Sequence, residues 1–77
     1  MEDLIERIVK ELVDKPDEVT VTLVESERTI IYELRVGDGD LGKVIGKRGR
    51  TAGALRTFIS AISAKGGGKR ALLEIVE

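Results

Sequence analysis

Residues 42–51 read Gly-Lys-Val-Ile-Gly-Lys-Arg-Gly-Arg-Thr, and the interpretation of the whole chain starts from them. The stretch holds three glycines, at positions 42, 46 and 49, with four cations between and beside them. Because glycine costs a helix or strand roughly 0.5–1 kcal/mol relative to alanine, so dense a set of glycines needs a physical reason. We expect that an outside group approaches this backbone closely. The surrounding cations predict that the group is anionic.

Charge is segregated along the chain, although the formal net charge is only −1. Residues 1–40 carry twelve acids and five bases, whereas residues 41–73 carry eight bases and no acid. Local charge matters more for the capture of a ligand than the net charge of the molecule does. A solvated helix face would explain one or two lysines. Eight cations without an acid instead favour an anion-binding surface, such as one for nucleic acid.

The residues that the chain lacks exclude several chemistries. Its 77 residues include no cysteine and no histidine, so disulfides, thiolate metal sites and nucleophile–histidine pairs cannot form. The usual parts of hydrolytic catalysis are missing, although their absence does not by itself exclude it. We expect a protein that is not an enzyme and that uses no metal and no cofactor. No apolar run approaches the ~20 residues of a membrane span, and no signal-peptide pattern opens the chain. The sequence predicts one cytoplasmic domain over residues 1–77.

The first part of the chain predicts a helix and then a hairpin. Residues 3–14 predict an amphipathic helix, which Pro16 is expected to end. Its apolar stripe consists of Leu4, Ile5, Ile8, Val9 and Leu12. Residues 19–25 and 29–36 alternate and are rich in β-branched side chains, so they predict two strands. The short polar turn between them predicts antiparallel pairing.

A short helix is predicted immediately before the tight turn of the glycine-rich stretch. Residues 37–39 are Gly-Asp-Gly and break the second strand. Asp40 is expected to cap the N-terminus of a helix over residues 41–45 with its side chain. Gly46 is expected to end that helix. The turn over residues 46–49 follows directly, so its geometry depends on how this short helix is held.

A longer helix and a last strand complete the chain. Gly49 is expected to open a helix that continues to about Lys65, and the exposed N–H groups of its first turn would suit an anion. Its expected buried stripe is Leu55, Phe58, Ile59 and Ile62, and Tyr32 is the other aromatic expected in the core. The triglycine at 66–68 predicts a flexible end to the helix, and residues 69–76 predict a strand.

The resulting order is α-β-β-α-α-β, which predicts an α+β fold. The second and third strands are joined by a two-helix crossover, so we expect them to be parallel neighbours with a right-handed connection. The hairpin then places the first strand antiparallel on the other side of the second. All three helices should pack on one face of this three-stranded mixed sheet. Glu33 and Arg35 fit a solvated opposite face, whereas Ile31 on the same side indicates a partner surface.

The chain resembles the KH domain family in its type II, prokaryotic form. The resemblance is carried by residues 41–51 around a Gly-x-x-Gly turn, by the βααβ order of residues 29–76, and by the added helix and strand before them. Gly37-Asp38-Gly39 departs from the Ala-Pro-Glu-like entry that small stand-alone bacterial members often carry. The resemblance implies an RNA-binding site made of Lys43, Val44, Ile45, Gly46, Lys47, Arg48, Gly49, Arg50 and Thr51.

In KH domains the Gly-x-x-Gly loop clamps the backbone of about four unpaired nucleotides, and bases lie in an apolar groove beside it. By resemblance, Val44 and Ile45 with the second strand would line that groove; we expect one of the two to belong to the core instead. The resemblance further implies a homodimer and pairing with a larger protein that joins a KH domain to a second nucleic-acid-binding domain. It also implies RNA chaperone activity, post-transcriptional regulation, and a role in cell shape and cell-wall biogenesis.

Two other functions compete with RNA binding. A nucleotide-binding P-loop requires G-x-x-x-x-G-K-[ST], but Gly42 to Gly46 is one residue short and Arg48 stands where Ser or Thr should be. The stronger alternative is a protein-interaction module that keeps the KH fold and binds little RNA. The acidic first helix and the slim residues 52–54 could build its dimer surface.

Overall fold

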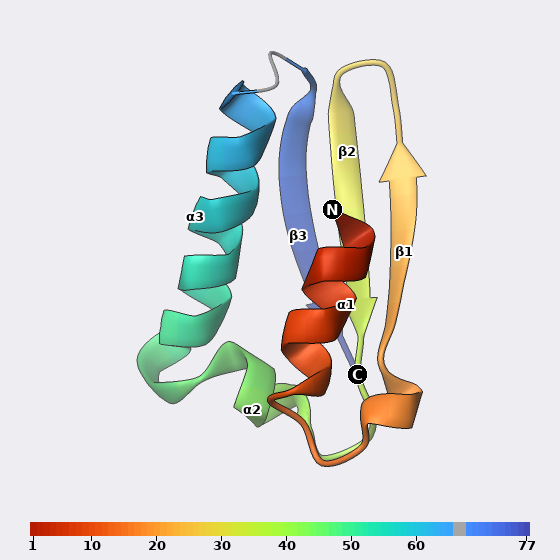
Figure 1. Cartoon of the computed structure of the whole chain (residues 1–77), viewed down its shortest axis with the longest axis vertical. Coiled ribbons are helices and arrows are strands. Elements are labelled where there is room, and N and C mark those ends of the chain that lie inside the picture. The colour runs from red at the N-terminus through yellow and green to blue at the C-terminus, as the bar shows by residue number, and fades with distance from the viewer. Residues whose placement is uncertain (66–67) are drawn as a thin grey trace.

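The computed structural model describes residues 1–65 and 68–77, and it has the predicted order of helices and strands (Figure 1). The predicted end at Gly66-Gly67-Gly68 falls mostly outside the described residues. Two short 3-10 turns, η1 and η2, are added to the predicted elements. The elements are α1 (Glu2–Lys10), η1 (Pro16–Glu18), β1 (Thr20–Glu25), β2 (Thr29–Arg35), α2 (Leu41–Ile45), η2 (Lys47–Gly49), α3 (Arg50–Lys65) and β3 (Arg70–Val76).

The three strands form one mixed sheet in the order β1-β2-β3, as predicted. β1 pairs with β2 antiparallel, with Leu23 opposite Tyr32. β2 pairs with β3 parallel, with Tyr32 opposite Leu73. The central strand therefore belongs to both the hairpin and the two-helix crossover. This places β3 at one edge of the sheet, and Figure 1 shows α3 running beside that edge.

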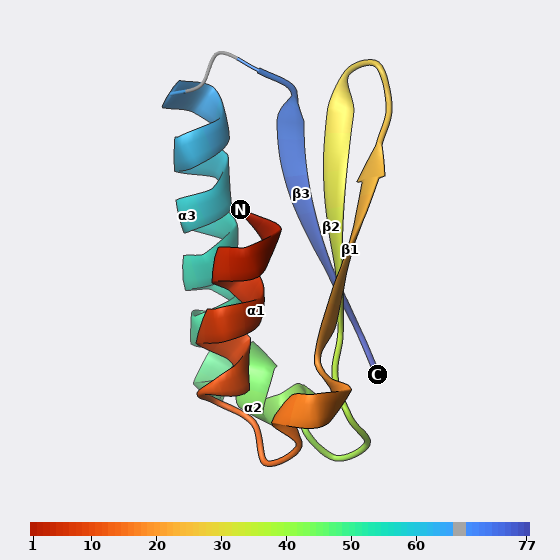
Figure 2. The ribbon, with the colours of Figure 1, turned by 45° about the vertical axis from the view of Figure 1, so that its right-hand side comes forward.

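The helices lie on one side of the sheet, and the core fills the space between the two layers (Figure 2). α1 and α3 form the helical layer, while α2 lies near its lower end in this view. The core consists of buried side chains from the three α-helices, from β2 and β3, and from the segments beside the strands: Ile5, Val9, Val19, Tyr32, Leu34, Val36, Val44, Leu55, Ile59, Ala71 and Leu73. Burial raises the pKa of the Tyr32 phenol, and the charges of Glu2 and Glu25 raise it further. Among the described residues, no helix has the length and apolarity that crossing a membrane requires.

The prediction for the first helix was wrong at its C-terminal end. α1 ends at Lys10, not at residue 14, and residues 11–15 leave the helix before Pro16. The reason is tertiary, because the backbone N–H groups of Asp14 and Lys15 donate to the side chain of Asp40. Ile5 and Val9 of the predicted stripe are buried, whereas Leu12 beyond the helix is exposed.

Phe58 and Ile62 correct the predicted core. Leu55 and Ile59 are buried as expected, but 41% of Phe58 and 42% of Ile62 are exposed. The buried face of α3 is centred on Ala52, Leu55 and Ile59, so the two larger side chains lie at its border. The prediction failed because it chose the buried stripe by the large apolar side chains. It placed Ala52 on a slim dimer surface, whereas Ala52 is buried in the core.

The face of the sheet that the helices leave uncovered carries the predicted polar residues of β2 together with a short apolar row. Register places Val24, Ile31 and Leu72 side by side across the three strands. Val24 and Leu72 are exposed, and Ile31 is half-buried. This face is therefore less polar in its middle than at its ends.

Candidate nucleic-acid interface

The Gly-x-x-Gly turn is a tight reversal between α2 and α3, as the sequence predicted. α2 ends at Ile45, the 3-10 turn η2 spans Lys47–Gly49, and α3 begins at Arg50. Three residues of the turn have positive φ angles: Gly46 (78°), Arg48 (57°) and Gly49 (74°). A positive φ is uncommon for a residue that carries a Cβ, so Arg48 is held in a conformation that it adopts rarely. Such conformations cluster at functional sites.

Gly46 is required by its surroundings as well as by its backbone angles. A Cβ added there would lie 2.7 Å from Cβ of Thr51 and would also meet the Thr51 hydroxyl. The Thr51 side chain therefore packs directly against the Gly46 backbone. Its geometry gives Thr51 a role in holding the turn, whether or not it also contacts RNA.

Two of the amides that were expected to be free for an anion are already used inside the turn. The Gly49 N–H donates to the Gly46 carbonyl oxygen (3.1 Å), and the Arg50 N–H donates to the Lys47 carbonyl oxygen. These bonds close the turn and make it rigid. Attraction of an anion to this region therefore depends mainly on the side-chain charges.

The cations at and beside the turn point into solvent. Lys47, Arg48 and Arg50 are exposed, and none of them forms a salt bridge with another of the described residues. Lys43 is different, because its Nζ lies 3.2 Å from Oδ2 of Asp14. The turn thus presents three cations without an acid partner and a fourth that is paired with an exposed acid.

The apolar pair before the turn divides as expected. Val44 is completely buried in the core, so its place among the RNA-contacting residues is corrected. Ile45 is half-buried and lies at the end of α2. Only Ile45 is left as an apolar side chain that this pair could offer to a ligand.

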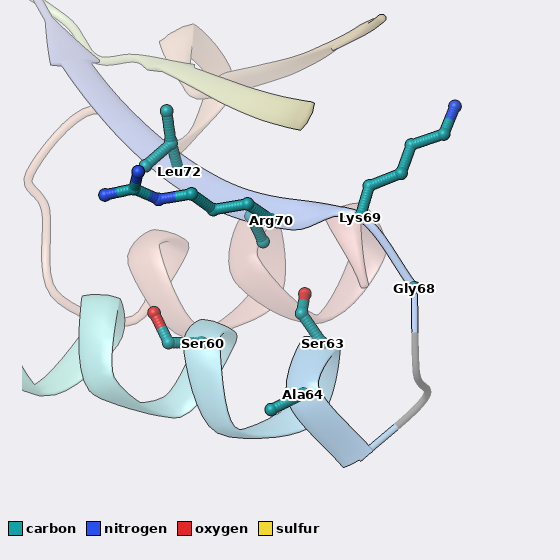
Figure 3. Close-up of a pocket in the computed structure, with 8 residues that line it drawn as sticks. Ser60, Ser63, Ala64, Gly68, Lys69, Arg70 and Leu72 are labelled. Atoms are coloured by element: carbon teal, nitrogen blue, oxygen red, sulfur yellow. The ribbon is translucent and has the colours of Figure 1, made fainter. Parts of the chain in front are cut away.

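A groove lies between α3 and β3, and Figure 3 shows the residues that line it. Its volume is about 350 Å³, and its lining consists of Ser60, Ser63, Ala64, Gly68, Lys69, Arg70, Ala71 and Leu72. A smaller hollow of about 130 Å³ shares Ser60, Ala71 and Leu72 with it and adds Arg56. These hollows lie on other elements than the short helix and the second strand, which were predicted to line a groove for bases. The small side chains Ser60 and Ala64, four residues apart on α3, are the sequence signal for the hollow between α3 and β3.

The cations beside the groove differ in how they are engaged. Lys69 forms a 2.6 Å salt bridge with Glu25, and Figure 3 shows its side chain extending away from α3. Arg70 lies along the groove between Leu72 and Ser60 in the same view. Arg56 and Arg70 are exposed and form no salt bridge with another described residue. Arg56 extends the positive surface from the turn along α3, and Arg70 adds to it from β3.

The chemistry of this surface is that of binding. Exposed cations suit phosphates, and serine hydroxyls beside alanine and leucine suit the polar edges and flat faces of bases. Neither aromatic residue lines the groove, so stacking of bases on aromatic rings is not a feature of this surface. Within the described part of the chain, no three residues among the acids are grouped so that they could hold a metal ion.

The element order, the mixed sheet and the Gly-x-x-Gly turn between two helices define a type II KH domain. This class of domain binds single-stranded nucleic acid through that turn and the groove beside it. The chain belongs to the KhpA/KhpB KH-domain family, whose model matches residues 2–75.

Three curated relatives support this assignment over the whole chain. The RNA-binding protein KhpA of Aquifex aeolicus is 54% identical over 77 residues, which cover 100% of this chain and 96% of the relative. KhpA of Clostridium acetobutylicum is 53% identical over 99% of this chain and 100% of its own length. KhpA of Borreliella burgdorferi is 52% identical over 97% of this chain and 90% of its own length. All three are named as RNA-binding proteins and not as enzymes. No solved structure matches the chain significantly.

Proposed function

We propose that this protein binds single-stranded RNA, with the Gly-x-x-Gly turn at the sugar-phosphate backbone. The observation that carries the proposal is the exposure of Lys47, Arg48 and Arg50 without acid partners on a turn whose backbone is fixed. Relatives about half identical over their whole length are named RNA-binding proteins, which supports the same function here.

Each part of the turn has a separate role in this proposal. Lys47 and Arg48 contact phosphates from the tip, and Arg50 adds charge from the first turn of α3. Gly46 and Gly49 allow the tight backbone, and Thr51 holds it from beneath. When RNA binds, Lys43 leaves Asp14 and pairs with a phosphate. Loss of the Lys43–Asp14 ion pair costs little, because an exposed ion pair is worth about 0–1 kcal/mol.

The groove between α3 and β3 accommodates the bases in the same proposal. Its serines offer hydrogen bonds to base edges, while Ala64, Ala71 and Leu72 offer apolar contact. Arg56 and Arg70 flank this path and attract the backbone that joins the bases. Because no aromatic ring lines the groove, we expect modest affinity and weak preference for sequence.

A salt-dependent titration tests the proposal. The double variant Lys47→Asp with Arg48→Asp should abolish binding of a fluorescent single-stranded RNA while leaving the circular dichroism spectrum unchanged. The matched control, Arg7→Asp with Lys10→Asp, makes the same charge change on the exposed surface of α1. The control should keep most of the affinity, because it changes the charge of α1 and the Lys10–Glu6 salt bridge but leaves the turn intact. Binding by the loop variant equal to that of the parent at the same salt would refute the assignment.

A protein-interaction role is the second candidate, and the exposed Phe58 and Ile62 on α3 favour it. Large apolar side chains on a helix surface indicate a surface that another protein covers. We propose a homodimer and, because the matched family includes both KhpA and KhpB, pairing with a KhpB (Jag)-like partner. Dimerisation would place two turns on one RNA and increase its avidity, so the two functions are compatible.

On the basis of the family resemblance, we extend the proposal to the role of the protein in the cell. RNA chaperone activity and post-transcriptional regulation in the cytoplasm are part of it, and an effect on cell shape and cell-wall biogenesis is a further prediction. A strand-annealing assay tests the first of these directly: the parent should accelerate annealing of two complementary RNAs, and the loop double variant should not.

A further inference from the structure

Asp40 is buried and charged, and neither the turn nor the groove uses its side chain. Only 2% of the residue is exposed. Its Oδ1 accepts the backbone N–H of Asp14 (3.2 Å), and its Oδ2 accepts that of Lys15 (2.9 Å). It was predicted to cap α2 with its side chain, but it makes no such bond there. The carboxylate instead fixes a segment that lies 25 residues earlier in the chain.

Further contacts connect the same two segments. The Nζ of Lys15 donates to the Asp38 carbonyl oxygen (2.9 Å), and Lys43 pairs with Asp14 (3.2 Å). We call this set of contacts among Asp14, Lys15, Asp38, Asp40 and Lys43 the Asp40 bridge. Its outer contacts are exposed to solvent and contribute little. The buried carboxylate dominates the bridge, because burial of a charge is tolerated only when its hydrogen bonds are made.

The bridge lies at the start of α2, and the Gly-x-x-Gly turn lies at the other end. α2 has only five residues, Leu41–Ile45, which is too short for a helix to be stable by itself. It is held from inside by Val44, which is fully buried, and at its first turn by Asp40, whose carbonyl oxygen accepts the Lys43 N–H (3.0 Å). The position of the turn therefore depends on how firmly the start of α2 is fixed.

We propose that Asp40 is a positioning residue for RNA binding, a role that rests on the proposed function of the turn. Through the bridge it fixes the first turn of α2 and so determines where Lys47 and Arg48 meet a phosphate. Asp40 does not contact RNA. Its loss lowers the fraction of molecules with a correctly placed turn, and apparent affinity falls in proportion to that fraction. The number of phosphate contacts, which sets the slope of affinity against salt, is unchanged.

The first test uses the unmodified protein. If the buried hydrogen bonds of Asp40 favour RNA binding, then RNA binding must stabilise those bonds by the same factor, because coupling between two sites is reciprocal. Hydrogen exchange measured by NMR, with and without a saturating single-stranded RNA, should therefore show slower exchange at the amides of Asp14 and Lys15. Unchanged exchange at both amides would overturn the proposal.

The second test compares Asp40→Asn with Asp38→Asn. The first variant keeps the shape of the side chain but turns an N–H donor toward a backbone N–H, which breaks one bond of the bridge. We expect its affinity for RNA to fall on the order of tenfold, within the usual range for coupled sites, with an unchanged salt slope. Asp38 takes part only through its main-chain oxygen, so Asp38→Asn should keep its affinity.

The outcomes separate the two proposals. A folded Asp40→Asn variant with the affinity of the parent, or with a lower salt slope, would overturn the positioning role. If that variant fails to fold, hydrogen exchange in the unmodified protein decides. Binding by the double variant Lys47→Asp with Arg48→Asp would refute the proposed function itself, whatever Asp40 does. If the double variant loses binding and Asp40→Asn keeps it, only the role of Asp40 is refuted.

Discussion

The two sides of α3 differ in chemistry, although they belong to one helix. The side toward β3 carries Arg56, Ser60 and Ala64 and lines the groove. Phe58 and Ile62 lie about 160° around the helix axis from Ser60, given 3.6 residues per turn. One side offers cations and small polar groups, and the other offers exposed apolar surface.

This difference is the basis for the proposal that α3 serves two partners. Small side chains beside a strand leave room for a ligand, and unpaired arginines attract an anionic one. Large apolar side chains on the far side leave no such room, and exposed apolar side chains of this kind suit the protein partner proposed above. The RNA-binding function and the interaction function can therefore be changed separately, by substitutions only two residues apart.

Among single substitutions on α3, the largest effect is expected for Ser60→Glu. The longer, charged side chain would fill the groove and repel phosphates, and like charges at an interface cost several kcal/mol, so RNA affinity should fall about a hundredfold. The control is Ala61→Glu, which makes a similar change at the next, exposed position of α3. Fluorescence anisotropy with single-stranded RNA measures both. Equal affinities for the two variants would show that the groove does not hold RNA.

An intermediate effect is expected for Phe58→Asp on self-association. Because 41% of Phe58 is exposed, its removal should cost the monomer only about 1 kcal/mol of stability. The variant should sediment as a monomer at concentrations where the parent dimerises, and its affinity for a short RNA should be unchanged. Sedimentation velocity and anisotropy measure the two properties. An unchanged dimer would remove the second candidate function from this side of the helix.

The smallest effect is expected for Gly53→Ala. An added Cβ at Gly53 meets nothing within 4 Å, and glycine costs an exposed helix position about 1 kcal/mol relative to alanine, so thermal unfolding should show greater stability by roughly that amount. Gly53 lies on the groove side of α3 by helix geometry, so the new methyl group should weaken RNA binding a few-fold. The reverse change on another side, Ala54→Gly, should lower stability without affecting binding. If the Gly53→Ala variant is more stable than the parent and binds RNA with full affinity, the RNA lies farther from α3 than proposed.

Local sequence patterns predicted the features that depend on neighbours in the chain. Glycines, the alternation of apolar residues and the rules for strand connections predicted three features. These are the bounds of α2, the start and end of α3 to within one residue, and the pairing of the strands. These are also the features that place Lys47 and Arg48 at the tip of the turn. The position of the turn in the fold was therefore predictable without any structure.

Features that depend on distant contacts were not predictable in the same way. The early end of α1 and the true partners of Asp40 depend on a contact between segments 25 residues apart. The groove depends on which side of α3 faces β3, and Ala52 in the core determines that rotation. Large apolar side chains dominated the sequence pattern, so Phe58 and Ile62 were expected inside.

Mapping of ultraviolet crosslinks between the unmodified protein and a single-stranded RNA tests the central claim most directly. Mass spectrometry of the crosslinked peptides identifies the residues that carry nucleotide adducts. The account predicts adducts within residues 43–51 and at the groove, on Arg56, Ser60 and Arg70, with loss of all of them in the loop double variant. Adducts confined to Phe58 and Ile62, or to Val24 and Ile31 on the uncovered face of the sheet, would contradict it.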